Sequence, residues 1–312
     1  MFGKSQKRFL SGAAVAALAL SVVGGAVAQN READVRLSRD LVAAASAFET
    51  FMGKAGAIDA KFDNAKEVAD AVKVGAAHDA SQLQAGMVAY AALAALQEPS
   101  FVSGVERAAR YEGRDALAQQ LLERPDLAAA LPGAEPAAAR AAGALAAKSE
   151  PLTADGRRVK QAAYDVQRQA WSKVRVPQPA SRLANAKQLS ATRFRPTDDD
   201  AARLYRAVSS RPTASPRGYM SPVVARGLAL AALSLLDAAG EENSQALQQV
   251  VNDAGSASCL RMAKLNLFQC LAVAGPHYED IFCLGEHAMI EPGQCVSKAA
   301  GLAVTPTRYS ER

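Results

Sequence analysis

The chain has 312 residues, of which 50% are hydrophobic, only 5% are aromatic and 21% are charged, and its formal net charge is +5. Alanine is abundant and has the highest intrinsic helix propensity, whereas the aromatic and β-branched residues that strands favour are scarce, so the composition argues against a β-rich fold. The sequence therefore predicts an all-α protein, a helical bundle whose helices pack closely through small side chains. The length is sufficient for one large domain or two modest domains.

Residues 1–28 have the three parts of an export signal. Three basic residues precede an apolar stretch over residues 9–23, and a small-x-small sequence ends at Ala28. We therefore expect cleavage between Ala28 and Gln29. The alternative, an uncleaved membrane anchor, is disfavoured because the apolar stretch is shorter than the roughly 20 residues that span a bilayer. The sequence predicts a periplasmic or secreted protein with no transmembrane span in the mature chain.

Basic residues are concentrated in one part of the chain. Removal of the signal, with its three basic residues, lowers the formal net charge from +5 to +2, whereas the segment from Arg157 to Arg217 holds 14 Lys and Arg against four acidic residues. Such a segment can attract a protein or an anionic envelope component. The alternative is a solvated face that is neutralised by the protein's own acidic residues. Aromatic residues such as Trp171 intersperse the segment, but export argues against nucleic acid as a partner.

The N-terminal helical region is expected to cover residues 29–175. Its helices are predicted from apolar residues spaced by three or four positions and from capping residues. They are expected at Arg31 to Gly53, from Asp63 or Asn64 to Ala76, at Asp79 to Gln97, at Val102 to Tyr111, at Arg114 to Glu123, and from Glu135 towards Val174 with a break at Pro151.

A linker is predicted at residues 176–197, because Pro177 and Pro179 interrupt any helix and no hydrophobic period follows. A C-terminal helical region is expected at residues 198–305, followed by a tail at residues 306–312. Its first helix begins at Thr197, and the three aspartates at positions 198–200 are interpreted as helix-capping charges rather than metal ligands.

Further along this region, a turn-rich connector is expected at residues 211–218. The most apolar helix of the mature chain is predicted at Val223 to Ala239, where Ser221 caps it and Pro222 occupies its first turn. It contains Arg226 and Asp237 and is short for a membrane span, so a buried core helix is the better interpretation. A polar-faced helix is expected to follow at Glu241 to Asp253.

The four cysteines, Cys259, Cys270, Cys283 and Cys295, all lie in the C-terminal region. An even number of cysteines in an exported chain indicates disulfides. A helix from Ser256 to Ala274 and a returning helix from Tyr278 to Met289 are expected to fold back about Gly275-Pro276. This antiparallel arrangement favours the nested pairs Cys270 with Cys283 and Cys259 with Cys295 among three possible connectivities. The arrangement resembles that of twin-cysteine helical-hairpin proteins, although the spacings depart from that family's regular pattern.

The same stretch also has the residue types of a metal site. Cys283 and His287 have the four-residue spacing that places two ligands on one helix face, and further candidate ligands surround them. These are His277, Glu279, Asp280, Glu286 and Cys295. The spacing matches no zinc motif, and oxidation would remove the thiolates, so disulfides are the preferred interpretation and no metal is predicted.

The chain contains none of the local motifs of common hydrolases or nucleotide-binding proteins, such as GxSxG, HExxH or a glycine-rich phosphate loop. No catalytic residue and no cofactor are predicted. The sequence is most consistent with an exported, non-enzymatic structural or binding protein of the cell envelope. The alternative is a cell-wall-directed hydrolase whose carboxylates converge in three dimensions, with Glu279, Asp280 and Glu286 as the residues to locate.

Overall fold

A computed structural model describes residues 37–212 and 220–304 of the chain. In these residues the protein consists of α-helices and short 3₁₀ and π-helical turns without a β-strand, which confirms the predicted all-α fold. The predicted cleavage position at Ala28 and Gln29, the tail at residues 306–312 and most of the connector at residues 211–218 lie outside this part. None of the described helices is both long and apolar enough to cross a bilayer.

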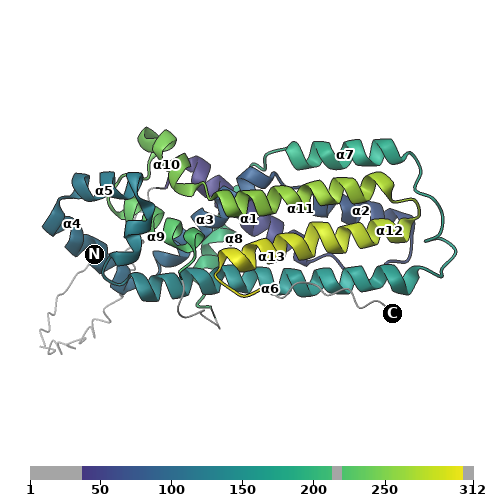
Figure 1. Ribbon diagram of the computed structural model, residues 1–312, viewed down its shortest axis with the longest axis horizontal. Helices are drawn as coiled ribbons and strands as arrows, with labels where there is room; N and C mark the ends of the chain where they lie inside the picture. The colour runs from purple at the N-terminus through teal and green to yellow at the C-terminus, as the bar shows by residue number, and fades with distance from the viewer. Residues whose placement is uncertain (1–36, 213–219, 305–312) are drawn as a thin grey trace, which may run out of the picture. The chain divides into compact units, whose positions relative to one another are not determined.

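Figure 1 shows the helices in the described part of the chain. In chain order they are α1 (Arg39–Gly56), α2 (Ala65–Ala76), α3 (Ala80–Ala95), α4 (Pro99–Glu112), α5 (Arg114–Glu123), η1 (Pro125–Ala130), α6 (Ala134–Val166), α7 (Pro179–Ala191), α8 (Asp198–Ser209), α9 (Pro222–Leu235), η2 (Glu241–Asn243), α10 (Ser244–Val251), α11 (Ala254–Val273), α12 (His277–Cys283), η3 (Leu284–Ile290) and α13 (Glu291–Ala299).

Helix α3 is the most deeply buried element of the core. It packs against α1, α6, α9 and α11. Because these helices leave little of its surface to water, α3 has no polar stripe. Small residues allow these close approaches. A Cβ atom on Gly86 of α3 would lie 2.0 Å from the carbonyl oxygen of Ala44 in α1, and one on Gly227 of α9 would lie 2.8 Å from the Cβ atom of Ala91 in α3. The expected packing through small side chains is therefore present in the core.

Helix α6 continues through Pro151, where the sequence suggested a break. Proline removes one backbone donor, so the carbonyl group four residues earlier loses its partner. That residue, Ala147, is exposed, and so is Pro151, so water can hydrate the carbonyl group. The helix ends at Val166, earlier than expected, and turns follow it.

The C-terminal hairpin consists of α11 and a returning helical run from His277 to Ala299. Its two disulfides join Cys259 to Cys295 and Cys270 to Cys283, with Cα–Cα distances of 5.8 and 5.6 Å. The nested pairing predicted from the helix geometry is therefore confirmed. Helix α11 is capped by Asp253, whose Oδ1 atom accepts a hydrogen bond from the Ser256 amide at 2.7 Å, rather than by Ser256 as expected.

The returning run is longer than the sequence indicated, because it passes through a π-helical turn at Leu284–Ile290 and continues as α13. Pro292 is the second residue of α13 and directly follows the π-helical turn. The π-helical turn packs against α6 at close range. A Cβ atom on Gly285 would lie 2.5 Å from the backbone nitrogen of Lys160, so glycine is needed for this contact.

The segment at residues 176–197, where a linker without a helix was expected, contains helix α7. Pro179 starts this helix in a position that proline tolerates. The segment lacks a hydrophobic period because only Ala186 and Ser190 of the helix are buried. Helices that precede and follow this segment also pack together, including α3 with α9 and α6 with α13.

Helix α8 begins with a capping box, in agreement with the sequence. The Thr197 hydroxyl accepts from the Asp200 amide at 3.3 Å, and the Asp200 carboxylate accepts from the Thr197 amide at 2.9 Å. Burial alone would raise the pKa of Asp200, but the hydrogen bonds from Thr197 and the charge of Arg203 together lower it.

We expect Thr197→Ala to lower the free energy of unfolding by about 1 kcal/mol at pH 7, because the substitution removes the cap. The pKa of Asp200 is lowered in the folded state. The stabilisation from the contacts of its carboxylate, including those with Thr197, is therefore present above the carboxyl's ordinary pKa and is lost as the pH falls through the pKa of the folded state. Urea unfolding at pH 7 and at pH 3 measures both effects. Ser209→Ala, at the exposed end of the same helix, is the control, and equal stability of the two variants at pH 7 would contradict the prediction.

Candidate binding cleft beneath helix α7

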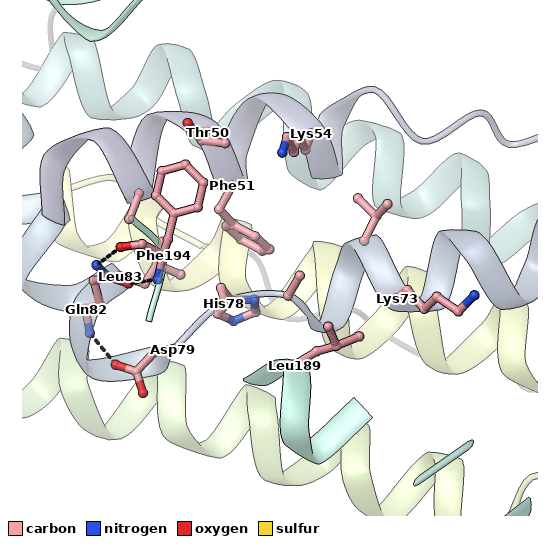
Figure 2. Close-up of a pocket in the computed structure, with 13 residues that line it drawn as sticks. Thr50, Phe51, Lys54, Lys73, His78, Asp79, Gln82, Leu83, Leu189 and Phe194 are labelled. Atoms are coloured by element: carbon pink, nitrogen blue, oxygen red, sulfur yellow. Dashed lines mark hydrogen bonds between the residues drawn. The ribbon is translucent and has the colours of Figure 1, made fainter. Parts of the chain in front are cut away.

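Two adjoining cavities lie beneath helix α7, and we refer to them together as the α7 cleft. The larger cavity has a volume of about 580 Å³ and lies between α2, α7 and the start of α12. The smaller has a volume of about 280 Å³ and lies between α1, the connection from α2 to α3, and the segment that follows α7 (Figure 2). Lys73 and Leu189 line both cavities.

The walls of the cleft are mainly apolar. In the larger cavity they are formed by alanine, valine and proline side chains, and in the smaller by two phenylalanines and aliphatic residues. The apolar lining residues are Ala65, Ala69, Val72, Val174, Val176, Pro177 and Ala186 in the larger cavity, and Ala47, Phe51, Val74, Ala77, Leu83 and Phe194 in the smaller.

Lysines stand at the exposed edges of the cleft. Lys66 and Lys73, both exposed, share one carboxylate partner, Asp70, at 2.7 and 2.9 Å. Lys54 lines the smaller cavity and, in the described part of the chain, forms no ion pair. Among the described residues, these three lysines form ion pairs with Asp70 alone, and the carboxylates of Glu67 and Asp79 also lie near this edge.

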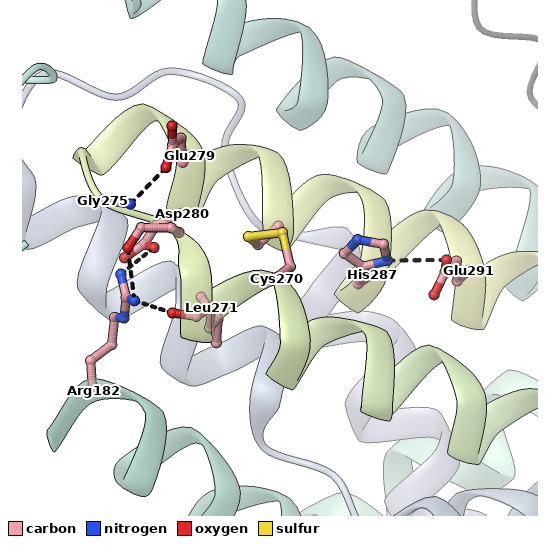
Figure 3. Close-up of a disulfide and its surroundings, with 10 residues drawn as sticks. Arg182, Cys270, Leu271, Gly275, Glu279, Asp280, His287 and Glu291 are labelled. Atoms are coloured by element: carbon pink, nitrogen blue, oxygen red, sulfur yellow. Dashed lines mark hydrogen bonds and ion pairs between the residues drawn. A yellow bond between two sulfur atoms is a disulfide. The ribbon is translucent and has the colours of Figure 1, made fainter. Parts of the chain in front are cut away.

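Helix α7 is held to the hairpin by one buried arginine. Arg182 forms an ion pair with Asp280 and donates hydrogen bonds to the carbonyl oxygens of Leu271 and Ala274, the latter at 3.2 Å (Figure 3). These carbonyl groups belong to the last turn of α11, where backbone acceptors have no partner within the helix. Arg182 therefore caps α11 while it fixes the position of α7.

Burial of this contact shifts the pKa values of two groups beside the larger cavity. Burial raises the pKa of Asp280 to about 6, and the hydrogen bond and charge of Arg182 offset only part of that effect. Burial, and then the positive charge of Arg182, lower the pKa of His277. His277 is therefore largely neutral at pH 7.

A buried pair of nitrogen-containing side chains lies at the smaller cavity. The Lys264 Nζ atom of α11 lies 3.1 Å from the His78 Nδ1 atom and donates to the carbonyl oxygen of Ala76 at 3.0 Å. The ring of Phe51 covers the imidazole with a centroid distance of 4.0 Å. Burial lowers the pKa of Lys264 to about 7, and burial together with the charge of Lys264 lowers the pKa of His78 well below its ordinary value. No local sequence pattern indicates this pair, because its members are 186 residues apart.

Hydrogen bonds to a glutamine fix the far side of the smaller cavity. The Gln82 side chain donates to the carbonyl oxygen of Phe194 and accepts from its amide, both at 2.8 Å (Figure 2). At the other end of this covering segment, the Ser190 hydroxyl donates to the carbonyl oxygen of Ala76 at 2.9 Å. The chain from α7 to α8 is therefore attached to the wall of the cleft by specific contacts.

The three carboxylates proposed for a hydrolytic site have separate partners. Glu279 accepts a hydrogen bond from the Gly275 amide at 2.6 Å, Asp280 pairs with Arg182, and the buried Glu286 pairs with Lys160 at 2.8 Å. Asp280 lines the larger cavity of the α7 cleft, whereas Glu279 lines a different cavity beside Cys270. The structure does not bring these carboxylates together.

The residues weighed as metal ligands also serve other contacts. Cys283 and Cys295 are bonded to other cysteines, and the His287 Nδ1 atom lies 3.0 Å from the Glu291 carboxylate (Figure 3). Over the described ranges, no group of three or more His, Cys, Asp and Glu residues is arranged to hold a metal ion.

The basic segment from Arg157 to Arg217 runs from the end of α6 through α7 and α8. Some of its charges are neutralised within the protein, as in the pairs of Arg182 with Asp280 and Arg203 with Asp200. Others are exposed, including Lys173, Arg175, Lys187, Arg193 and Arg195. The segment therefore combines structural ion pairs with a solvated basic surface around the α7 cleft.

Comparison of the chain with protein families, with curated proteins and with solved structures finds no match in any of the three.

Proposed function

We propose that this chain is an exported, non-enzymatic binding protein of the cell envelope, and that the α7 cleft holds an elongated amphiphile with an anionic head group. The single observation that carries the proposal is the apolar cavity of about 580 Å³ with a second cavity adjoining it. Small-molecule sites in proteins are typically concave, mainly apolar and about 300–1,000 Å³ in volume, with a few polar groups that set orientation.

The charge at the edge of the cleft supports an anionic head group. Lys54, Lys66 and Lys73 supply more positive charge than the carboxylate of Asp70 neutralises. A long apolar ligand without charge would be accommodated by the walls but would gain nothing from these ammonium groups. This refines the expectation that the basic segment attracts an anionic envelope component, because α7 belongs to that segment and covers the cleft.

Two further observations support export and binding. Disulfides form and persist in oxidising compartments such as the bacterial periplasm, and both cysteine pairs of this chain are oxidised. The separate partners of Glu279, Asp280 and Glu286 favour a binding role over a cell-wall-directed hydrolase.

Ala69→Trp tests the proposal, because Ala69 lies at the exposed edge of the larger cavity, where a bulky side chain fills the cavity without entering the core. We expect wild-type protein to bind dodecanoate saturably in isothermal titration calorimetry. We expect the variant to bind at least about 10-fold more weakly, a loss of about 1.4 kcal/mol.

Ala191→Trp is the matched control, because Ala191 is exposed at the end of α7 and lines neither cavity. It is expected to keep the wild-type affinity. The proposal is wrong if wild-type protein shows no saturable binding, or if both tryptophan variants bind as the wild type does.

A further inference from the structure

The smaller cavity of the α7 cleft has an unusual polar group among its apolar walls. His78 lines the cavity, and Lys264 lies directly behind it with its Nζ atom 3.1 Å from the His78 Nδ1 atom. Both side chains are buried. A buried ammonium group is costly, and the carboxylate of Asp79 offsets the burial of Lys264 only in part, so this amine beside a buried imidazole calls for an explanation.

The contact restricts which protons the ring carries. An ammonium group offers only donors, so the Nδ1 atom of His78 accepts from Lys264 whenever that amine is charged. The proton of the neutral ring is then on Nε2, which makes this atom a hydrogen-bond donor, and the backbone of Gly75 is one acceptor near the ring. An oxygen acceptor is therefore the ligand group that this ring favours.

We propose that the smaller cavity receives the carboxylate of an acyl ligand, that His78 donates a hydrogen bond to it, and that Lys264 gains a proton as the ligand binds. The inference rests on the proposed function, since it identifies the head group that the same cleft binds and where that group lies. The larger cavity would then hold the apolar chain. The proton comes from solvent, and no covalent bond forms or breaks.

A carboxylate suits this position better than a phosphate. One imidazole donor and one ammonium charge behind it match a single negative charge, whereas a phosphate carries up to two charges and more acceptor oxygens than these two groups satisfy. The other polar residues that line the smaller cavity are Thr50, Lys54, Lys73, Asp79 and Gln82. The Gln82 side chain is already used on the backbone of Phe194, and the Asp79 carboxylate accepts a hydrogen bond from the Gln82 amide. The carboxylate would therefore be held by His78 and compensated electrostatically by Lys264.

The charged groups around the pair determine the expected proton uptake. Burial lowers the pKa of Lys264 to about 7, while Asp79 acts in the opposite direction, and Lys54 and Lys73 stand at the edge of the cavity. Near pH 7 the amine of Lys264 in the free protein is therefore partly deprotonated. A bound carboxylate raises the pKa of this amine, so binding takes up a fraction of a proton, and affinity falls as the pH rises above about 7.

Calorimetric titration of dodecanoate and of dodecanol, each in phosphate and in Tris buffer at pH 7, tests the inference. These buffers differ in ionisation enthalpy, so proton uptake appears as a difference in the observed heat. We expect a difference for dodecanoate and none for dodecanol. Equal heats for dodecanoate in the two buffers would overturn the inference.

Lys264→Met removes the amine but keeps an unbranched side chain, and replacement of a buried charge by an apolar group of similar volume is often tolerated. We expect this variant to bind dodecanoate about 10-fold more weakly, to lose the proton uptake, and to bind dodecanol unchanged. Lys187→Met, on the exposed side of α7, is the control and is expected to behave as the wild type.

The outcomes separate the inference from the proposed function. If dodecanol binds to the wild type and Lys264→Met weakens the binding of both ligands equally, or of neither ligand, the head-group assignment is wrong. The cleft then remains a binding site. If neither ligand binds to the wild type, both proposals are wrong. If circular dichroism shows that Lys264→Met does not fold, His78→Phe and the pH dependence of wild-type affinity decide the question. An affinity for dodecanoate that does not change between pH 6 and pH 8 would overturn the inference.

Discussion

Gly86→Ala is expected to lower the free energy of unfolding by about 3 kcal/mol or more. The added Cβ atom would lie 2.0 Å from the carbonyl oxygen of Ala44, which is backbone and cannot rotate away. Helices α1 and α3 would have to separate, and α3 is packed against four other helices of the core. Urea unfolding followed by circular dichroism measures the change.

Gly53→Ala in α1 is the matched control, because no atom lies within 4 Å of its added Cβ. This substitution is expected to raise the free energy of unfolding by about 0.5–1 kcal/mol, since alanine loses less backbone entropy in a helix than glycine does. Both substitutions make the same chemical change in a helix, so only their surroundings differ. Similar effects at the two positions would show that the core does not depend on the close crossing of α1 and α3.

Removal of the outer disulfide by the double substitution Cys259→Ala and Cys295→Ala is expected to cost about 4 kcal/mol of unfolding free energy. Removal of the inner disulfide, Cys270 with Cys283, is expected to cost about 3 kcal/mol. The difference follows from the sequence separations of 36 and 13 residues, because a longer loop gains more entropy in the unfolded chain when its crosslink is removed.

Urea unfolding of the wild type and of both double variants without reductant measures these costs. With reductant present, the wild type should become less stable than either double variant without reductant, because it then lacks both disulfides. An inner disulfide that contributes clearly more than the outer one would contradict the chain-entropy explanation.

The features of the fold that depend on local chemistry were predictable from the sequence. The all-α class follows from composition, the cap at Thr197 from residue type and position, and the disulfide pairing from helix geometry about the turn at Gly275-Pro276. Each of these depends on residues close together in the chain, or on a crosslink whose geometry limits the possible partners.

The features that the sequence did not reveal depend on distant contacts or on weak local signals. Helix α7 buries only two residues, so it leaves no hydrophobic period. Pro151 suggests a break in α6, but it lies on the exposed side of the helix, where water can hydrate the carbonyl group that loses its partner. The pairing of His78 with Lys264 joins residues 186 positions apart, and no local pattern indicates it. The cleft itself arises only when α1, α2, α7 and the hairpin pack together.

The two walls of the α7 cleft differ in how firmly each is fixed. The hairpin wall is crosslinked by sulfur near both of its ends, whereas α7 is attached mainly by Arg182 at one end and by Ser190 at the other. Gln178, just before α7, has a left-handed backbone conformation with φ of 50°, which is unfavourable for a residue other than glycine. We therefore expect any movement that opens the cleft to occur in α7 rather than in the crosslinked hairpin.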